Sequence, residues 1–218
     1  CFAFRPRVAA LLNISEDHLD RYSGLEEYAA AKMRIFQAQG PEDFAVLGAD
    51  CPVVRRLADR VASRILRFSA KERVEEGAFL RGDELVLRLD GREHAFARCA
   101  ETALWAPYDR LNLLAAACMA AAMGAVPEGI RSAALSFRGL PHRMEDCGEV
   151  GGVRWINSSM CTNPRAGAEA ARAVAGRFPL VLIAGGAQKD CGYSDWGREV
   201  AGCARSVILM GRDRGILR

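Results

Sequence analysis

The chain has 218 residues, of which half are hydrophobic and 26% are charged, and its net charge is +3 at pH 7. This composition is ordinary for a soluble globular protein, and the length allows one large domain or two modest ones. The small charge and the scattered arginines give no sign of nucleic-acid binding. No apolar run reaches the roughly 18 residues of a transmembrane helix, and no signal peptide is expected.

Eight cysteines are spread along the chain, at positions 1, 51, 99, 118, 147, 161, 191 and 203. None forms a C-x-x-C pair, and a disulfide framework or a zinc site would need tighter spacing. We therefore expect reduced, mostly buried thiols in a cytoplasmic protein. The chain starts at Cys1 rather than at a methionine, and Arg218 follows a strand-like run directly. Both ends look cut, which predicts an internal piece of a longer protein.

The first elements alternate between apolar strands and helices. A short apolar run at residues 8–14 suits a buried strand. Residues 25–39 are predicted to form a helix that carries Lys32. A strand at residues 44–50 and a helix at residues 52–62 are expected to follow.

The next stretch, residues 64–99, is predicted to be a β-meander, because Arg81-Gly82-Asp83 and Asp90-Gly91 are turn signals between apolar runs. Its strands are expected at residues 65–68, 78–81, 84–89 and 93–98. The alanine-rich run at 108–124 predicts a helix that is packed on both sides. A second helix is expected at 127–136.

The helical pattern breaks at Gly139-Leu140-Pro141. We therefore expect one domain at residues 1–139 and a second at 140–218, the latter beginning with a hairpin joined through Gly151-Gly152. Its later elements are predicted as a helix at 164–175 capped by Thr162 or Asn163, a strand at 180–184, a helix at 195–204 and a strand at 206–210. The order β-α-β-α-β predicts an α/β fold with a doubly wound sheet.

One segment is chemically distinctive: Asp17-His18-Leu19-Asp20 is followed, at the end of an alanine-rich helix, by Lys32. Alone, a histidine near a helix start is more often a cap or a packing residue, and a lysine on a helix is usually solvated. Together these residues resemble the metal and carbamyl-lysine segment of the Mur ligases. Members of that family are ATP-dependent enzymes that form the amide bonds of the peptide in bacterial cell-wall precursors.

The resemblance implies a catalytic metal site at His18 and Lys32. The family's matching lysine carries a carbamate made with CO2, which turns a cation into the kind of oxygen donor that Mg²⁺ prefers. The matching histidine supplies a nitrogen ligand. Mg²⁺ at such a site neutralises the phosphates of ATP while a carboxylate attacks the γ-phosphorus.

Two further segments resemble parts of the family that bind the nucleotide. The segment 139–145 matches the stretch that opens the family's C-terminal domain, which implies that His142 and Arg143 lie at the nucleotide. A guanidinium suits this role because it binds phosphate oxygens bidentately. The helix near residue 108 is similar to one that touches adenine. Asn112 matches a family asparagine there, whereas Tyr108-Asp109 departs from the pattern.

Residues 152–163 resemble the family's strand-to-helix segment, in which Thr162 matches a threonine that contacts the incoming glutamate. Ser158 stands at the nucleotide site, where the family has an aspartate that holds the ribose. Met160 stands where a lysine approaches the nucleotide, and Cys161 replaces an alanine. Two charged contacts to the nucleotide are therefore missing.

The last match is an apolar strand that runs into Gly185-Gly186 and Lys189. The family's equivalent lysine binds the side-chain carboxylate of glutamate, and Lys189 is expected to do the same. Because the matches occur in the family's order across nearly the whole chain, the resemblance implies the second half of the central ATPase-type domain at 1–139. It implies the first part of the Rossmann-like C-terminal domain at 140–218. No Gly-x-x-x-x-Gly-Lys-[Ser/Thr] phosphate loop occurs in this stretch.

The implied reaction joins D-glutamate to UDP-N-acetylmuramoyl-L-alanine through an acyl phosphate, with ATP and Mg²⁺, in a cytoplasmic monomer with no nucleic-acid or membrane partner. The fragment alone is expected to be inactive. Two alternatives stay open. One is a related ligase with another amino-acid acceptor, of the folylpolyglutamate or cyanophycin synthetase type. The other is a non-catalytic homologue that lost nucleotide contacts, which Ser158 and Met160 motivate.

Overall fold

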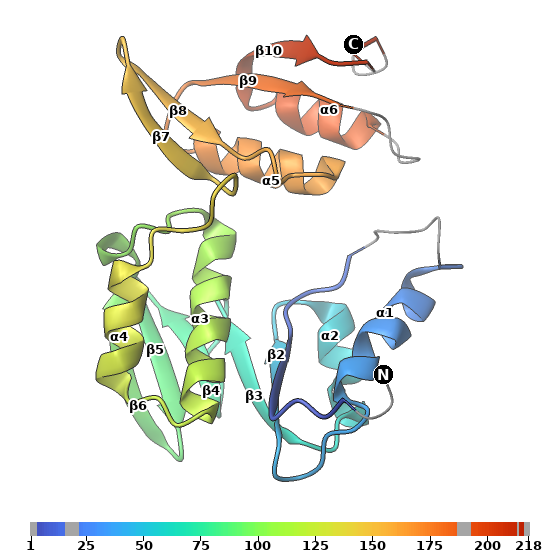
Figure 1. Cartoon of the computed structure of the whole chain (residues 1–218), viewed down its shortest axis with the longest axis vertical. Coiled ribbons are helices and arrows are strands. Elements are labelled where there is room, and N and C mark those ends of the chain that lie inside the picture. Colours follow the sequence, from blue (N-terminus) through green and yellow to red (C-terminus); the bar gives the residue numbers. More distant parts are fainter. Residues whose placement is uncertain (1–3, 16–21, 187–192, 213, 216–218) are drawn as a thin grey trace. The chain divides into compact units, whose positions relative to one another are not determined.

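The computed structural model describes residues 4–15, 22–186, 193–212, 214 and 215. The chain divides into two compact units, a larger unit at Cys1–Arg138 and a smaller unit at Gly139–Arg218. The α/β class that the sequence predicts is confirmed, because strands and helices occur in both units (Figure 1).

The larger unit is built on a six-stranded sheet in the order β1-β2-β3-β4-β5-β6. The first four strands are parallel, and β5 and β6 continue the sheet in antiparallel pairs. The strands are β1 (Val8–Leu11), β2 (Phe44–Gly48), β3 (Arg64–Ser69), β4 (Gly77–Arg81), β5 (Glu84–Leu89) and β6 (Arg92–Arg98). The helices are α1 (Leu25–Met33), η1 (Arg34–Phe36), α2 (Pro52–Leu57), η2 (Ala58–Arg60), η3 (Cys99–Glu101), α3 (Pro107–Ala122) and α4 (Pro127–Ser136).

Helices cover both faces of the parallel strands because successive side chains of a strand point to opposite faces. In β2, Val46 joins a core with α3 and α4, whereas Ala45 and Leu47 join a second core with α1 and α2. Figure 1 shows α3 and α4 side by side along β4–β6. In β3, Phe68 faces the first core and Ile65 packs against the second. This division explains why the central strands read as continuous apolar runs.

The predicted four-stranded meander is wrong at its first step, because β3 and β4 are parallel. No turn signal stands between them. Instead, the connecting residues 70–76 return along the sheet, and Val74 packs with Phe79 and Val86 in a small core of its own. The other two turns are confirmed: Gly82 and the Asp90-Gly91 pair have the positive φ angles that tight hairpin turns require.

The smaller unit contains a hairpin and a parallel pair. The hairpin is formed by β7 (Glu145–Val150) and β8 (Val153–Asn157), and φ is positive at both Gly151 and Gly152, as predicted. The remaining elements are α5 (Pro164–Ala175), β9 (Leu180–Gly185), α6 (Ser194–Ala201) and β10 (Ala204–Met210), with β9 and β10 parallel.

The β-α-β-α-β order is confirmed, but the doubly wound sheet is not formed by the described residues. There, β8 pairs with β7, and β9 and β10 form a separate two-stranded sheet. The tight Gly-Gly turn brings β7 against β8 locally. Ala171 of α5 and Val200 of α6 share one core with Leu180 of β9. Ile183 and Ile208, which lie opposite each other on the parallel pair, are half exposed.

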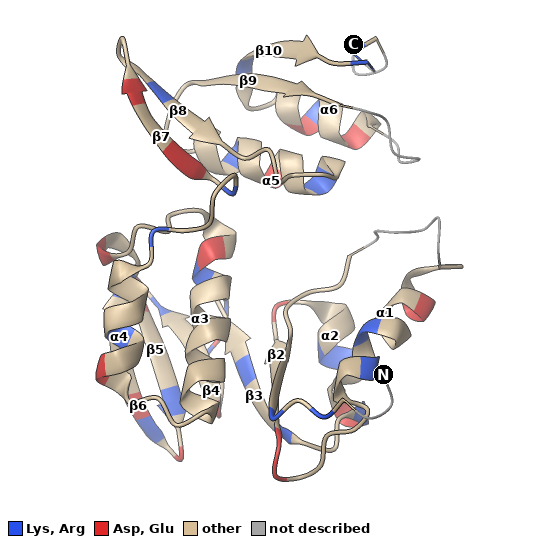
Figure 2. Cartoon of the chain, viewed as in Figure 1, with Lys and Arg blue, Asp and Glu red and all other residues tan. Residues whose placement is uncertain are grey.

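Charges of both signs are interspersed over both units (Figure 2), and many of them form surface ion pairs. Within the described ranges, no helix is both long and apolar enough to cross a bilayer. The six cysteines in those ranges are free. The prediction that the thiols are mostly buried is wrong, because only Cys118 of the six is fully buried. Burial raises the pKa of the Cys118 thiol to about 12.

Gly48, at the end of β2, tests the close packing of the larger unit. A Cβ atom at this position would lie 2.0 Å from the carbonyl oxygen of Leu12 and 3.1 Å from the Phe68 ring. We expect Gly48→Ala to lower the free energy of unfolding, measured in urea, by about 3 kcal/mol, the upper part of the usual cost of overpacking. Gly129→Ala in α4 is the matched control. Its Cβ would make only an ordinary 3.8 Å contact with Val126, and alanine should stabilise the helix by about 0.5–1 kcal/mol. Wild-type stability of Gly48→Ala would contradict the close approach.

Candidate functional site

Lys32 lies in the last turn of α1, as the sequence predicts, and its side chain is exposed. Its amine lies 5.2 Å from the centroid of the Tyr28 ring, one turn earlier in the helix. The Tyr28 ring in turn lies 5.2 Å, between centroids, from the ring of Tyr22. The lysine therefore reaches back by one turn of the helix to the ring of Tyr28. Tyr22 follows the Asp17-His18-Leu19-Asp20 segment closely in sequence.

The predicted metal partner His18 lies outside the described residues. Within them, no three His, Cys, Asp or Glu side chains gather as a metal site would require. An unmodified Lys32 would repel Mg²⁺, so only its carbamate would fit such a site.

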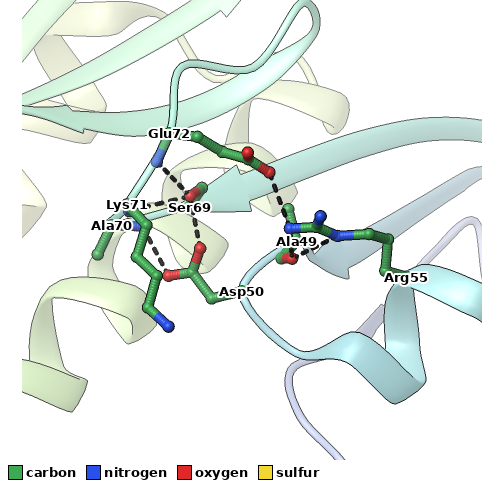
Figure 3. A network of polar contacts seen from close by, with 7 residues as sticks. All are labelled: Ala49, Asp50, Arg55, Ser69, Ala70, Lys71 and Glu72. Carbon is green, nitrogen blue, oxygen red and sulfur yellow. Dashed lines mark hydrogen bonds and ion pairs between the residues drawn. The ribbon is translucent and has the colours of Figure 1, made fainter.

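The carboxyl ends of β2 and β3 are joined by a polar network (Figure 3). The Ser69 hydroxyl, which is fully buried, donates to Asp50 Oδ1 at 2.6 Å. Its oxygen also accepts the backbone N–H groups of Lys71 and Glu72, at 3.0 and 2.9 Å. Asp50 Oδ2 accepts the Ala70 N–H at 2.9 Å. The chain that leaves β3 is thereby fixed to the end of β2, at the edge where open α/β sheets place their ligands.

A second set of contacts holds α2 against this edge. Arg55 of α2 donates from Nε and Nη2 to the Ala49 carbonyl oxygen, at 3.1 and 2.8 Å. Its Nη2 also pairs with Glu72 Oε1 at 3.0 Å (Figure 3). No sequence motif indicated this network, because each residue type in it is common in loops.

Asn112 is exposed on α3, near the start of that helix. It lies on the opposite side of the sheet from Lys32, because α3 and α1 pack against opposite faces. The neighbouring departure from the family pattern has a structural role. Asp109 is buried, and its Oδ2 accepts the N–H of Ala106 at 3.0 Å, which caps the start of α3.

His142 and Arg143 lie in a tight turn at the start of the smaller unit. His142 and Met144 both have positive φ, of 63° and 51°. Met144 is buried, whereas Arg143 between them is exposed. Glu145 Oε2 accepts the His142 N–H at 2.8 Å, and the Asn157 side-chain amide donates to His142 Nδ1 at 2.9 Å. The turn is thus anchored on both sides of Arg143 and presents the guanidinium to solvent.

Ser158 and Cys161, two of the departures from the family pattern, contact each other. The Ser158 Oγ and Cys161 Sγ atoms lie 3.2 Å apart in a hydrogen bond. Cys161 also donates to the Ala166 carbonyl at 3.6 Å. The loop between β8 and α5 is therefore closed by this pair. The sequence had indicated each substitution but not their contact.

Thr162 is exposed directly before α5. The cap of that helix is Asn163, one of the two predicted candidates, whose Oδ1 accepts the Ala166 N–H at 2.8 Å. Lys189 lies outside the described residues. Gly185, which precedes it, is explained by packing, because a Cβ there would lie 1.9 Å from the Met210 carbonyl oxygen.

Comparison with known proteins identifies the family to which the chain is related. The Mur ligase middle domain matches residues 1–120. A UDP-N-acetylmuramoylalanine–D-glutamate ligase from Pelotomaculum thermopropionicum is 38% identical to this chain, and the match covers 98% of this chain and 47% of the relative's length. A ligase of the same name from Geobacter metallireducens is also 38% identical, and the match covers 96% of this chain and 45% of that relative's length. The chain spans about half the length of the curated relatives that it matches.

Solved structures show the same fold. MurF from Acinetobacter baumannii has a TM-score of 0.76 at 19% identity, with 97% of this chain and 48% of that chain covered. The apo form of L. casei FPGS has a TM-score of 0.66 at 18% identity, with 96% of this chain and 52% of that chain covered. Because the matching family domain covers more than half of the 218 residues, the chain belongs to the Mur ligase family.

Proposed function

We propose that this chain is part of an ATP-dependent ligase that adds D-glutamate to UDP-N-acetylmuramoyl-L-alanine. The observation that carries the proposal is the 38% identity, over nearly the whole chain, to relatives named for this ligation. The five family segments found in the sequence support it, since they include residues for the metal, the nucleotide and the acceptor. Activity is expected of a protein as long as those relatives, and not of these 218 residues alone.

The metal centre is proposed at His18 and carbamylated Lys32. The position of Lys32 supports this, because its amine lies over the ring of Tyr28, and that ring contacts Tyr22, which follows His18 by four residues. Mg²⁺, when bound there, would neutralise charge on the phosphates of ATP. Carbamylation removes the positive charge of the amine and supplies two oxygen donors at its end.

The nucleotide is proposed to contact Asn112, His142, Arg143 and Ser158. The anchored turn supports a phosphate or ribose contact by Arg143, since its exposed guanidinium is carried by a fixed backbone. His142 supports that turn through its backbone N–H and its ring. Ser158 offers a hydroxyl in place of the family's carboxylate.

The acceptor is proposed to bind at Thr162 and Lys189. Thr162 lies before the first turn of α5, whose free N–H groups favour an anion. Lys189 adds a full positive charge for a second carboxylate. D-Glutamate carries two carboxylates and suits this pair better than a neutral or basic amino acid would.

In the proposed reaction, the alanine carboxylate of the UDP sugar attacks the γ-phosphorus, and ADP leaves. The D-glutamate amine then attacks the carbonyl carbon of the acyl phosphate, loses a proton and displaces inorganic phosphate. Cationic side chains such as Arg143 stabilise the charge that develops on phosphate oxygens. The relatives' names do not favour another acceptor or a non-catalytic homologue. The larger unit is proposed as part of the central domain and the smaller unit as part of the C-terminal domain, in a cytoplasmic monomer.

The carbamate is tested by Lys32→Ala in the full-length protein. We expect ligation to fall by more than the roughly 10–100-fold that outer partners of a metal ligand contribute. Acetate should restore part of the activity, because it replaces the lost oxygen atoms. Arg60→Ala is the control, since Arg60 is an exposed cation of the same unit and lies at the end of η2. Full turnover of Lys32→Ala would exclude the assignment.

Arg143 is tested together with its supporting turn. Arg143→Ala should raise the KM for ATP about tenfold or more, the usual value of a charged hydrogen bond. Glu145→Ala should raise the same KM by a smaller factor, because it frees the His142 N–H. Glu149→Ala, which removes a carboxylate from the same strand, should leave the value near that of the wild type. If all three variants had equal KM values for ATP, Arg143 would not be a nucleotide contact.

Acceptor binding is tested by Lys189→Ala. The KM for D-glutamate should rise about tenfold or more, while the KM for ATP changes little, because only the acceptor carboxylate loses its ionic partner. Steady-state kinetics with each substrate varied in turn measures both values, again with Arg60→Ala as the control. An unchanged KM for D-glutamate would remove Lys189 from the acceptor site.

A further inference from the structure

The side chain of Cys51 contacts a strand exit rather than its own helix. Cys51 is the residue before α2, at the position where a side chain usually caps the helix, yet it makes no such bond. Instead, its sulfur accepts the N–H of Ile14 at 3.5 Å and donates to the Ile14 carbonyl at 3.6 Å. One thiol therefore satisfies both backbone groups of Ile14, just beyond the end of β1.

The preceding residue, Asp50, makes the matching connection on the other side. Its two carboxylate oxygens accept the Ser69 hydroxyl and the Ala70 N–H at the end of β3. The dipeptide itself follows the end of β2. Asp50-Cys51 thus ties together the carboxyl ends of β1, β2 and β3. Two hydrogen bonds join Cys51 to Ile14 after β1, and two join Asp50 to the end of β3.

Ile14 is described by the structure and precedes His18 by four residues in the sequence. We propose that Asp50-Cys51 is a positioning element for the metal segment at His18, acting through Ile14 and touching neither substrate nor metal. The role of the dipeptide in metal binding rests on the proposed function. The two hydrogen bonds between the Cys51 thiol and Ile14, called the clamp below, do not rest on the proposed function, because they are contacts within the chain.

The chemistry of the thiol fits this task. A sulfur sits on a longer bond and has a larger radius than a hydroxyl oxygen, so it reaches both backbone groups of Ile14 from the adjacent loop. Serine also has one donor and can accept, and its hydrogen bonds are intrinsically stronger, but its shorter C–O bond leaves the oxygen farther from both backbone groups of Ile14. Alanine has neither. Replacing Cys51 by serine should therefore weaken the hydrogen bonds to Ile14, and replacing it by alanine should remove them, with only a small change in side-chain size.

The experiment uses the full-length protein with Cys51→Ser, Cys51→Ala and Asp50→Asn. Cys203→Ala is the control, because that thiol is half-buried like Cys51 but lies in the smaller unit. Hydrogen exchange at the Ile14 amide reports on the clamp. The Mg²⁺ concentration for half-maximal ligation reports on the metal segment, and the KM for D-glutamate reports on the acceptor site.

We expect Cys51→Ala to raise the exchange rate at Ile14 and the half-maximal Mg²⁺ concentration about threefold or more. Cys51→Ser should be intermediate in both, Asp50→Asn should raise the Mg²⁺ requirement, and the KM for D-glutamate should not change. Unchanged exchange at Ile14 in Cys51→Ala would overturn the clamp. Faster exchange with an unchanged Mg²⁺ requirement would overturn the positioning role. A wild-type protein without ligase activity would instead overturn the proposed function, while the exchange data would still decide on the clamp.

Discussion

Burial of both faces of the short parallel strands is the constraint on which the larger unit depends. Each of β1, β2 and β3 has only a few residues, and alternate side chains must enter different cores. The result is a sheet with α1 and α2 on one face and α3 and α4 on the other. This arrangement leaves the strand ends as the places where polar side chains can gather, and the Asp50–Ser69 network lies at one of them.

The same constraint separates the site residues that the sequence indicates. Lys32 and Asn112 lie on helices that cover opposite faces of one sheet. His142, Arg143, Ser158 and Thr162 belong to the smaller unit. These residues match different functions in the family, for the metal, the nucleotide and the acceptor. They are therefore carried by different secondary-structure elements, each held by its own local contacts.

Local sequence patterns located most helices and strands, because apolar periodicity and turn glycines act over a few residues. The pairing of strands that are distant in sequence was harder to predict. β4 is parallel to β3 because residues 70–76 return along the sheet, where Val74 packs with Phe79 and Val86, and no turn signal encodes this return. The pairing of β8 with β7, rather than within a doubly wound sheet, also depends on partners distant in sequence. At the site, the sequence predicts Asn163 as one of two possible caps, whereas the roles of Asp109 and Asn157 depend on partners that only the folded chain brings together.

The contact between Ser158 and Cys161 makes these two positions interdependent. The family pattern has an aspartate and an alanine where this chain has a serine and a cysteine, and here the two side chains share a hydrogen bond. Aspartate at position 158 alone would place a carboxylate against the sulfur, and alanine at position 161 alone would leave the serine hydroxyl without this partner. The side chain that suits one of these positions therefore depends on the residue at the other.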